Sequence, residues 1–151
     1  MHVSPKWFVY IVKCSDGSYY TGISNNVINR INKHNKGLGA KYTKNRGPLI
    51  LLLVLQFENR SEASKEEYKI KKLPKLKKIN LIKKNIMKLN QSEKGVKYDE
   101  YLRESDAYQR EISKIKSNYF INMPDEKQTE INNLQSKIDG LIIKVQELFL
   151  K

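Results

Sequence analysis

Two short segments near the start of the chain, joined by a turn, constrain its fold more than any other feature. Residues 7–12 (Trp-Phe-Val-Tyr-Ile-Val) and residues 19–23 (Tyr-Tyr-Thr-Gly-Ile) are rich in aromatic and β-branched side chains, which favour β-strands. Between them, Asp16-Gly17 is a strong signal for a tight hairpin turn. The sequence therefore predicts a β-hairpin at this position.

A helix and a third strand are predicted next. Residues 24–26 (Ser-Asn-Asn) supply N-cap side chains for a helix over about 27–36, which Gly37 is expected to end. A basic loop then covers residues 37–48. The unbroken apolar run over 49–57 is typical of a strand that is buried on both faces.

Two more helices complete the predicted β-β-α-β-α-α order, which indicates an α/β domain over residues 1–90. Ser61 is expected to cap the first, over residues 62–73, and Pro74 is expected to open the second at its first turn. The apolar side of the second helix consists of Leu76, Ile79, Ile82, Ile86 and Leu89.

Residues 91–151 form a separate C-terminal extension in this interpretation. A polar linker over 90–95 precedes two further helical patterns, which Pro124 separates. The last pattern follows a heptad, whose apolar positions are Ile131, Leu134, Ile138, Leu141, Val145 and Leu148. We therefore expect an αα-hairpin or a coiled coil, which either folds back on the chain or binds a second copy or a protein partner.

Positive charge is concentrated in the first part of the chain. Residues 1–90 contain 19 lysines and arginines against five acidic residues, whereas residues 91–151 contain ten against 11. A basic domain of this kind points to a polyanionic partner, and nucleic acid is favoured over an anionic membrane surface or an acidic protein.

Cysteine usage and hydropathy exclude several protein classes. Cys14 is the only cysteine, which rules out an intramolecular disulfide and a multi-cysteine metal site. The N-terminus shows no apolar signal segment, and the longest apolar run is far shorter than the roughly 20 residues that a membrane span needs. We expect a cytoplasmic protein that does not enter a membrane.

Five residues have side chains suited to chemistry at phosphorus. Tyr10 and Tyr20 fall on paired strands, where a tyrosine hydroxyl can act as a general base once a neighbour lowers its pKa. Arg30 and His34 lie four residues apart on one helix face, where they can grip a phosphate or move a proton. Glu67 lies on a lysine-rich helix, and its carboxylate can hold Mg²⁺ together with substrate phosphates.

Each of these residues also has an ordinary structural explanation. Tyrosine is common in strands, and helical arginine and histidine are often simply solvated. A carboxylate among lysines forms ion pairs whether or not it binds a metal. Glu66 is as good a candidate for the metal ligand as its neighbour Glu67.

Two basic segments are suited to contacting DNA without reading its sequence. The first is a loop that contains Lys41, Tyr42, Lys44 and Arg46. Its cations would contact backbone phosphates, and its ring would stack on a base. A denser run of lysines around Lys71 and Lys72 extends the same positive surface.

Together these residues resemble the GIY-YIG endonuclease superfamily, which is named after two tripeptides on paired strands. Phe-Val-Tyr at residues 8–10 and Tyr-Thr-Gly at residues 20–22 stand in those places, and Arg30 and Glu67 match the helical arginine and the metal-binding glutamate. Four stretches are similar to its small, single-domain YhbQ-like branch: residues 20–24, 34–37, 39–43 and 67–73. The resemblance covers about residues 5–85 and favours Glu67 over Glu66.

The resemblance implies a three-stranded antiparallel sheet flanked by helices, and a metal-dependent endonuclease that acts on DNA. Tyr10, helped by Tyr20, would deprotonate the attacking water, and Arg30 with His34 would stabilise the scissile phosphate. Glu67 would hold one Mg²⁺ or Mn²⁺ as a Lewis acid on the leaving-group side.

Gly22 completes the second tripeptide, where the missing side chain would let the DNA backbone approach closely. Phe8, Val9 and Thr21 depart from the tripeptides, whereas the tyrosines are retained. The expected function is hydrolysis of DNA phosphodiester bonds, with repair or recombination intermediates as substrates. The alternative is a non-catalytic nucleic-acid-binding module whose helical tail serves oligomerisation or partner docking.

Overall fold

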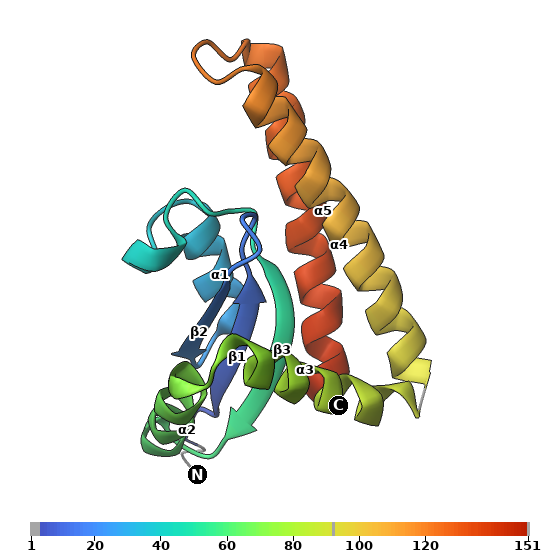
Figure 1. Ribbon diagram of the computed structural model, residues 1–151. Helices are drawn as coiled ribbons and strands as arrows, with labels where there is room; N and C mark the ends of the chain where they lie inside the picture. The colour runs from blue at the N-terminus through green and yellow to red at the C-terminus, as the bar shows by residue number, and fades with distance from the viewer. Residues whose placement is uncertain (1–3, 92, 151) are drawn as a thin grey trace.

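A three-stranded antiparallel sheet in the order β2-β1-β3 forms the centre of the molecule (Figure 1). The structure is a computed structural model that describes residues 4–91 and 93–150. Within these residues the chain follows the predicted β-β-α-β-α-α order and then continues as two long helices. The elements are β1 (Trp7–Lys13), β2 (Tyr19–Ser24), α1 (Val27–Asn35), the 3₁₀ helix η1 (Lys41–Thr43), β3 (Ile50–Phe57), α2 (Arg60–Lys72), α3 (Lys75–Asn90), α4 (Glu93–Asn118) and α5 (Asp125–Leu150).

β1 is the central strand, and its side chains from Phe8 to Val12 are buried. Its register places Tyr10 opposite Gly22 on β2 and opposite Val54 on β3. Because β1 has neighbours on both sides, a side chain that it contributes is held more rigidly than one on an edge strand. Tyr10 therefore sits on the best-fixed element of the fold.

The turn before β2 and the helix cap after it form where the sequence predicted them. Gly17 in the hairpin turn has a φ of 77°, and the backbone N–H of Ser18 donates to Asp16 Oδ1 over 2.9 Å. Asn26 caps α1, because its side-chain oxygen accepts a hydrogen bond from the backbone N–H of Asn29 over 3.0 Å. These local bonds fix the direction in which α1 leaves the sheet.

The start of α2 differs from the prediction. Asn59 caps the helix in place of Ser61, by accepting a hydrogen bond from the backbone N–H of Glu62 over 3.0 Å. Asparagine is as effective an N-cap as serine, and Asn59 comes first along the chain. The helix therefore begins at Arg60, and Ser61 lies inside its first turn.

α3 and the segment after it also depart from the sequence pattern. Leu76, which the spacing placed on the apolar side, is 68% exposed, whereas Ile82 is buried. The polar linker predicted over 90–95 is reduced to a short break, with residue 92 outside the described residues, and α4 starts at Glu93. Glutamate and lysine are good helix formers, so a polar composition did not prevent the helix.

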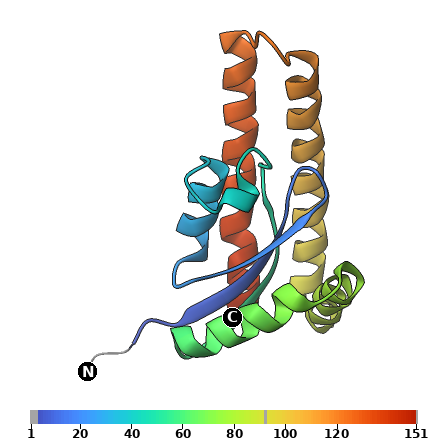
Figure 2. The same cartoon turned by 60° about the vertical axis from the view of Figure 1, so that its left-hand side comes forward.

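α4 and α5 form the predicted αα-hairpin, and they rise side by side beyond the sheet (Figures 1 and 2). α5 packs against β3 and α1. Its buried side chains include Ile138 and Ile142, whereas Leu141, which the heptad had placed on the buried side, is only half-buried. A straight helix on a sheet follows a period of 3.6 residues, and the heptad spacing of 3.5 would need a supercoiled partner helix.

The hairpin is bonded to β3, where the ladder with β1 has an irregular register. The backbone N–H of Leu51 donates to the Tyr101 hydroxyl over 2.7 Å, and the Tyr98 hydroxyl donates to the carbonyl of Leu52 over 2.7 Å. Gln109 donates in the same way to the carbonyl of Pro48 over 2.7 Å. Three side chains of α4 thus satisfy polar backbone groups that would otherwise be buried without partners.

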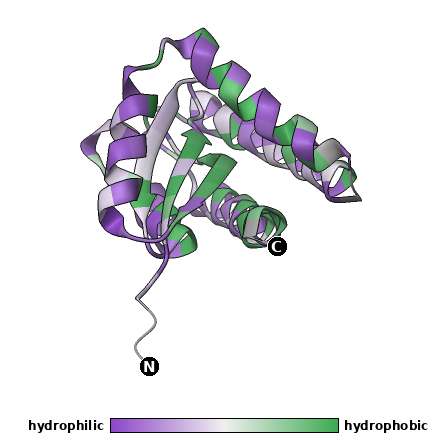
Figure 3. Ribbon diagram, turned by 90° about the horizontal axis from the view of Figure 1, so that it is seen from below, coloured by the Kyte–Doolittle hydropathy of each residue, from purple (hydrophilic) through white to green (hydrophobic). Residues whose placement is uncertain are grey.

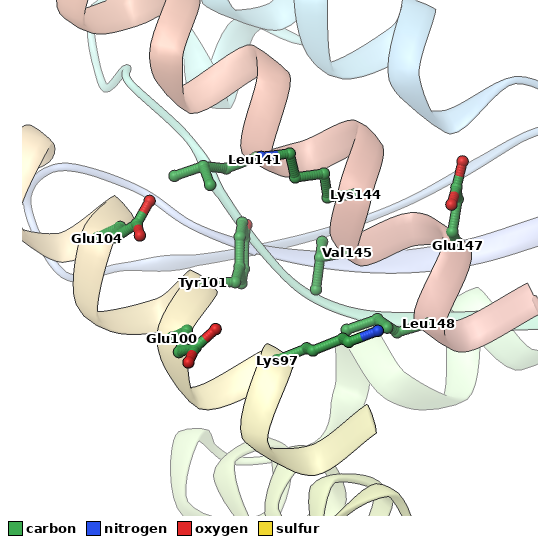
Figure 4. Close-up of a pocket in the computed structure, with 9 residues that line it drawn as sticks. All are labelled: Lys97, Glu100, Tyr101, Glu104, Leu141, Lys144, Val145, Glu147 and Leu148. Atoms are coloured by element: carbon green, nitrogen blue, oxygen red, sulfur yellow. The ribbon is translucent and has the colours of Figure 1, made fainter. Parts of the chain in front are cut away.

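Hydrophobic residues line the strands, and the helices around them show mixed colours, as amphipathic helices do (Figure 3). Between α4 and α5 lies a cavity of about 420 Å³, which Figure 4 shows with Tyr101 and Val145 facing it from the two helices. No helix within the described ranges is long and apolar enough to span a membrane.

Candidate active site

The hydroxyl of Tyr10 is the centre of the candidate site. The Tyr10 side chain is fully buried, and its hydroxyl oxygen lies 2.9 Å from Nε2 of His34 on α1. The Tyr20 ring, on the neighbouring strand, lies 6.3 Å from the Tyr10 ring and 5.1 Å from the His34 ring, measured between centroids. Two strands and one helix therefore bring these three side chains together.

The hydrogen bonds of His34 fix the position of its proton. Its Nδ1 accepts the backbone N–H of Ala40 over 3.1 Å and lies 2.6 Å from the hydroxyl oxygen of Thr43. Because a backbone N–H can only donate, Nδ1 carries no proton, and the ring proton belongs on Nε2, which donates to Tyr10. Burial and then the charge of Arg30 lower the pKa of His34 to about 4, so the ring is neutral at pH 7.

Arg30 and Glu67 act on the same tyrosine. Burial, and then proximity to Tyr20, raises the pKa of Tyr10 above its ordinary value. Hydrogen bonding to Arg30 and its positive charge oppose this shift, whereas the charge of Glu67 adds to it. The other four residues predicted to be catalytic therefore all interact with the Tyr10 hydroxyl.

A cleft of about 340 Å³ opens beside these residues. Its lining comes from β1, β2, α1 and α2 and consists of Trp7, Tyr20, Ile23, Ser24, Asn25, Arg30, Arg60 and Glu67. Arg60, which the sequence did not single out, places its guanidinium carbon 5.4 Å from the centre of the Trp7 ring. The sequence spacing could have indicated Arg60, because Arg60 and Glu67 are two helical turns apart and share a face of α2.

The structure separates the two neighbouring glutamates. Glu67 lines the cleft and forms an ion pair with Lys71 over 2.8 Å, and its side chain is 19% exposed. Glu66 instead pairs with Lys69 over 3.4 Å and does not line the cleft. Of the two candidates for a metal ligand, only Glu67 shares the cleft with Arg30 and Tyr20.

A metal at Glu67 would depend on the substrate for its remaining ligands. In the part of the chain that the structure describes, no three His, Cys, Asp or Glu side chains gather to form a metal site. One carboxylate with phosphate oxygens and water is a common arrangement for Mg²⁺, and oxygen ligands also suit Mn²⁺. The residues present therefore fit a metal that is bound together with a phosphate.

Two glycines are required by the packing of the site. A Cβ atom at Gly22 would lie 2.5 Å from the Tyr10 hydroxyl oxygen, and one at Gly39 would overlap the His34 ring. The sequence suggested that Gly22 admits the DNA backbone, but its closest neighbour is the Tyr10 ring. Gly39 was missed, because nothing in a single sequence connects it to His34.

The basic loop covers the other side of Tyr20. Tyr42 stacks on Tyr20 with a centroid distance of 6.0 Å and an interplanar angle of 24°. The Arg46 guanidinium lies 4.4 Å from the centre of the Tyr42 ring and also forms an ion pair with Asp16 over 3.2 Å. Part of the charge of Arg46 is therefore neutralised within the protein. Lys41 and Lys44 are exposed.

A second hollow, of about 360 Å³, lies between this loop and the lysine-rich helices. It is lined by Tyr19, Tyr20, Thr21, Tyr42, Lys71 and Lys78. Lys72, predicted to belong to the same surface, instead covers the exposed ring of Tyr68, with its ammonium nitrogen 4.1 Å from the ring centre. Lys78 belongs to the lysine run that was predicted to extend this surface, whereas Tyr19 was not predicted.

Comparison with known proteins agrees with this geometry. The family model described as the GIY-YIG catalytic domain matches residues 6–80. A UPF0213 protein of Staphylococcus aureus is 57% identical over 76 residues, which cover 50% of this chain and 93% of the relative. The chain belongs to the UPF0213 family of GIY-YIG domain proteins.

Other UPF0213 proteins give the same extent of similarity. The UPF0213 protein OB0043 of Oceanobacillus iheyensis is 52% identical over 75 residues, which cover 50% of this chain and 87% of the relative. The solution NMR structure of the UPF0213 protein BH0048 from Bacillus halodurans is 45% identical, with a TM-score of 0.36, and covers 52% of this chain and 83% of that one. The GIY-YIG domain is of the nuclease type, and α4 and α5 lie outside the family match.

Proposed function

We propose that this protein is a metal-dependent endonuclease that hydrolyses phosphodiester bonds in DNA. The observation that carries the proposal is the buried Tyr10 hydroxyl, which is bonded to a neutral His34 and lies beside Arg30, Tyr20 and Glu67. A structural tyrosine needs one hydrogen-bond partner, whereas this buried one also interacts with Arg30 and Glu67, which line an open cleft. Such a convergence is typical of a reaction centre.

In the proposed mechanism, the Tyr10 oxygen takes a proton from the attacking water while its own hydroxyl proton passes through the Tyr20 hydroxyl to solvent in the cleft. This relay is needed because burial raises the pKa of Tyr10 and keeps its hydroxyl protonated in the free protein. His34 donates through Nε2 to the Tyr10 oxygen, which favours the phenolate form, and Arg30 favours the same form by its charge. Arg30 also neutralises charge on the phosphate as the new oxygen–phosphorus bond forms and the ester bond breaks.

Glu67 is the residue that would hold Mg²⁺ or Mn²⁺ together with phosphate oxygens. The bound metal supplies Lewis-acid stabilisation of the charge on the leaving oxygen. Because Glu67 is paired with Lys71 over 2.8 Å, binding of the metal and that ion pair compete for one carboxylate.

The alternative is a module that binds nucleic acid without cutting it, with the tail as an oligomerisation or docking arm. One observation weighs against the tail as a dimer seam: the apolar stripe of α5 already packs against β3 and α1 of the same chain. The convergence around Tyr10 favours catalysis over simple binding.

A cleavage assay tests the proposal. Wild type and Tyr10→Phe would be incubated with labelled duplex, single-stranded and branched DNA in the presence of Mg²⁺, Mn²⁺ or EDTA. We expect metal-dependent cleavage that Tyr10→Phe lowers by at least about 100-fold. Tyr68→Phe is the matched control, because Tyr68 is exposed and does not line the cleft. Intact DNA binding with no cleavage of any substrate would favour the binding module.

A further inference from the structure

A small polar cavity lies where the C-terminal hairpin meets the GIY-YIG domain. It has a volume of about 180 Å³ and is bounded by the end of α1, the loop before β3, α4 and α5. Its lining includes His34, Asn35, Lys36, Gly37, Gly47, Lys116 and Gln135. The cavity is therefore shared between the GIY-YIG domain and the helices that lie outside the family match.

The charge in this cavity is positive. Lys36 comes from the GIY-YIG domain and Lys116 from α4, and neither forms an ion pair with another residue in the ranges 4–91 and 93–150. Two of the lining amides are bonded to Asp139, whose carboxylate accepts hydrogen bonds from Gln135 Nε2 over 3.0 Å and from Asn35 Nδ2 over 3.4 Å. Asp139 thus orients two amide side chains, and two ammonium groups remain against its one negative charge.

The size and chemistry of the cavity restrict the ligand. Of the lining residues only His34 has a ring, and this ring is buried against Tyr10 and Tyr20, so the cavity offers a nucleic-acid base no exposed ring to stack on. About 180 Å³ accommodates a tetrahedral anion with a few waters, but it is small for a whole nucleotide. Lysine ammonium groups with amide donors around them are a common setting for phosphate.

We propose that this cavity binds one backbone phosphate of the DNA substrate, and that the hairpin thereby contributes Lys116 directly to the substrate interface. This inference rests on the proposed function, because it takes DNA to be the ligand. It gives the C-terminal helices a role in binding that the family match does not cover.

The position of the cavity relative to the cleft fits the proposal. Arg30 lines the cleft and Lys36 lines the cavity, and these residues are six apart along α1 and the residue that caps it. At about 1.5 Å per residue this is roughly 9 Å along the helix, a distance that a short stretch of one DNA strand can span.

Salt-dependent DNA binding by the full chain tests the proposal. Binding would be measured in EDTA with Glu67→Ala, so that no cleavage occurs, and compared with Glu67→Ala carrying Lys116→Ala. We expect about fivefold weaker binding and a salt slope that is smaller by about 0.9, the value for one lost phosphate contact. Lys114→Ala is the matched control, since Lys114 is an exposed lysine of α4 outside the cavity.

The outcomes separate failure of this inference from failure of the proposed function. If the two lysine variants have equal slopes while the parent protein binds DNA, the inference is wrong and the proposed function stands.

If the parent protein does not bind DNA, the proposed function fails, and inorganic phosphate then tests the cavity alone. Phosphate should shift the backbone amide resonances of Gly37 and Gly47, and Lys116→Ala should abolish the shift. That result would assign the cavity to a free phosphate ligand. The absence of a shift would overturn the phosphate assignment.

Discussion

The GIY-YIG domain and the C-terminal hairpin each contain a hollow of comparable size, but the two differ in chemistry. The cleft beside β2 has about 340 Å³ and the cavity between α4 and α5 about 420 Å³. In the hairpin cavity, lysines and glutamates surround Tyr101 (Figure 4). The Tyr101 hydroxyl accepts a hydrogen bond from the backbone N–H of Leu51 on β3. The cleft contains Arg30 and Glu67, which also interact with the buried Tyr10 hydroxyl; that hydroxyl is bonded to His34, and both buried residues have shifted pKa values.

Volume is a poor guide to the candidate site in this molecule. The larger hollow lies between two helices, and the smaller one is lined by Arg30 and Glu67, which interact with the buried Tyr10 hydroxyl. Convergence of groups with perturbed protonation marks the candidate reaction centre.

The largest expected effect compares a glutamate of the cleft with a glutamate of the hairpin cavity. Glu67→Ala should lower cleavage by at least about 1,000-fold, because it removes the proposed metal ligand, and it should leave DNA binding intact because no positive charge is lost. Glu100→Ala, in the hairpin cavity, should leave the cleavage rate unchanged. Cleavage by Glu67→Ala at the wild-type rate would show that the metal assignment is wrong.

A second prediction concerns pH and the free energy of unfolding. His34 is neutral when buried, with a pKa of about 4, whereas an unfolded histidine has a pKa of 6.5. The unfolded chain therefore binds more protons in this interval, and stability should fall by up to about 3 kcal/mol as the pH drops from 6.5 to 4. Urea unfolding at several pH values measures this change in the free energy of unfolding. In His34→Asn this component should be missing, and an unchanged pH dependence would contradict the assignment.

Two glycine substitutions compare the packing of the domain and of the hairpin. Gly22→Ala should lower the free energy of unfolding by about 1–3 kcal/mol and displace Tyr10, because the new Cβ would overlap its hydroxyl. Gly140→Ala, on α5, has nothing within 4 Å of the new atom and should stabilise the helix by about 0.5–1 kcal/mol. Thermal unfolding of both variants measures these changes. A Gly22→Ala variant that is more stable than Gly140→Ala would contradict the prediction.

The smallest effect concerns the attachment of the hairpin. Tyr101→Phe leaves the backbone N–H of Leu51 without its partner and should cost about 1–2 kcal/mol of stability. Below the melting transition, the cleavage rate should stay within about twofold of wild type, because Tyr101 does not line the cleft. A large loss of activity in a folded variant would mean that the hairpin acts on the reaction centre.

Much of the site was predictable from sequence, because its residues lie on locally specified elements. The Asp16-Gly17 turn sets the β-hairpin, and the Asn26 cap sets the helix that carries Arg30 and His34. The choice between Glu66 and Glu67 was different, because adjacent helical residues point about 100° apart and only the packing of α2 decides which one faces the cleft.

What the sequence did not provide depends on contacts between distant segments. Position 39 must be glycine because a Cβ atom there would overlap the His34 ring. Lys116 and Lys36 line the same cavity only because α4 packs beside the loop before β3. The heptad pattern predicted a helix in the tail, but the surface that covers it is the chain's own sheet, which shifted the buried position from Leu141 to Ile142.

The bonds from α4 to β3 also affect how the protein can associate with other chains. A three-stranded sheet has two outer strands, and each offers backbone groups to which a foreign strand could add. Here Tyr98, Tyr101 and Gln109 occupy backbone groups on or next to β3. A foreign strand that added along the start of β3 would have to displace these three side chains first, so the hairpin protects this part of the outer edge.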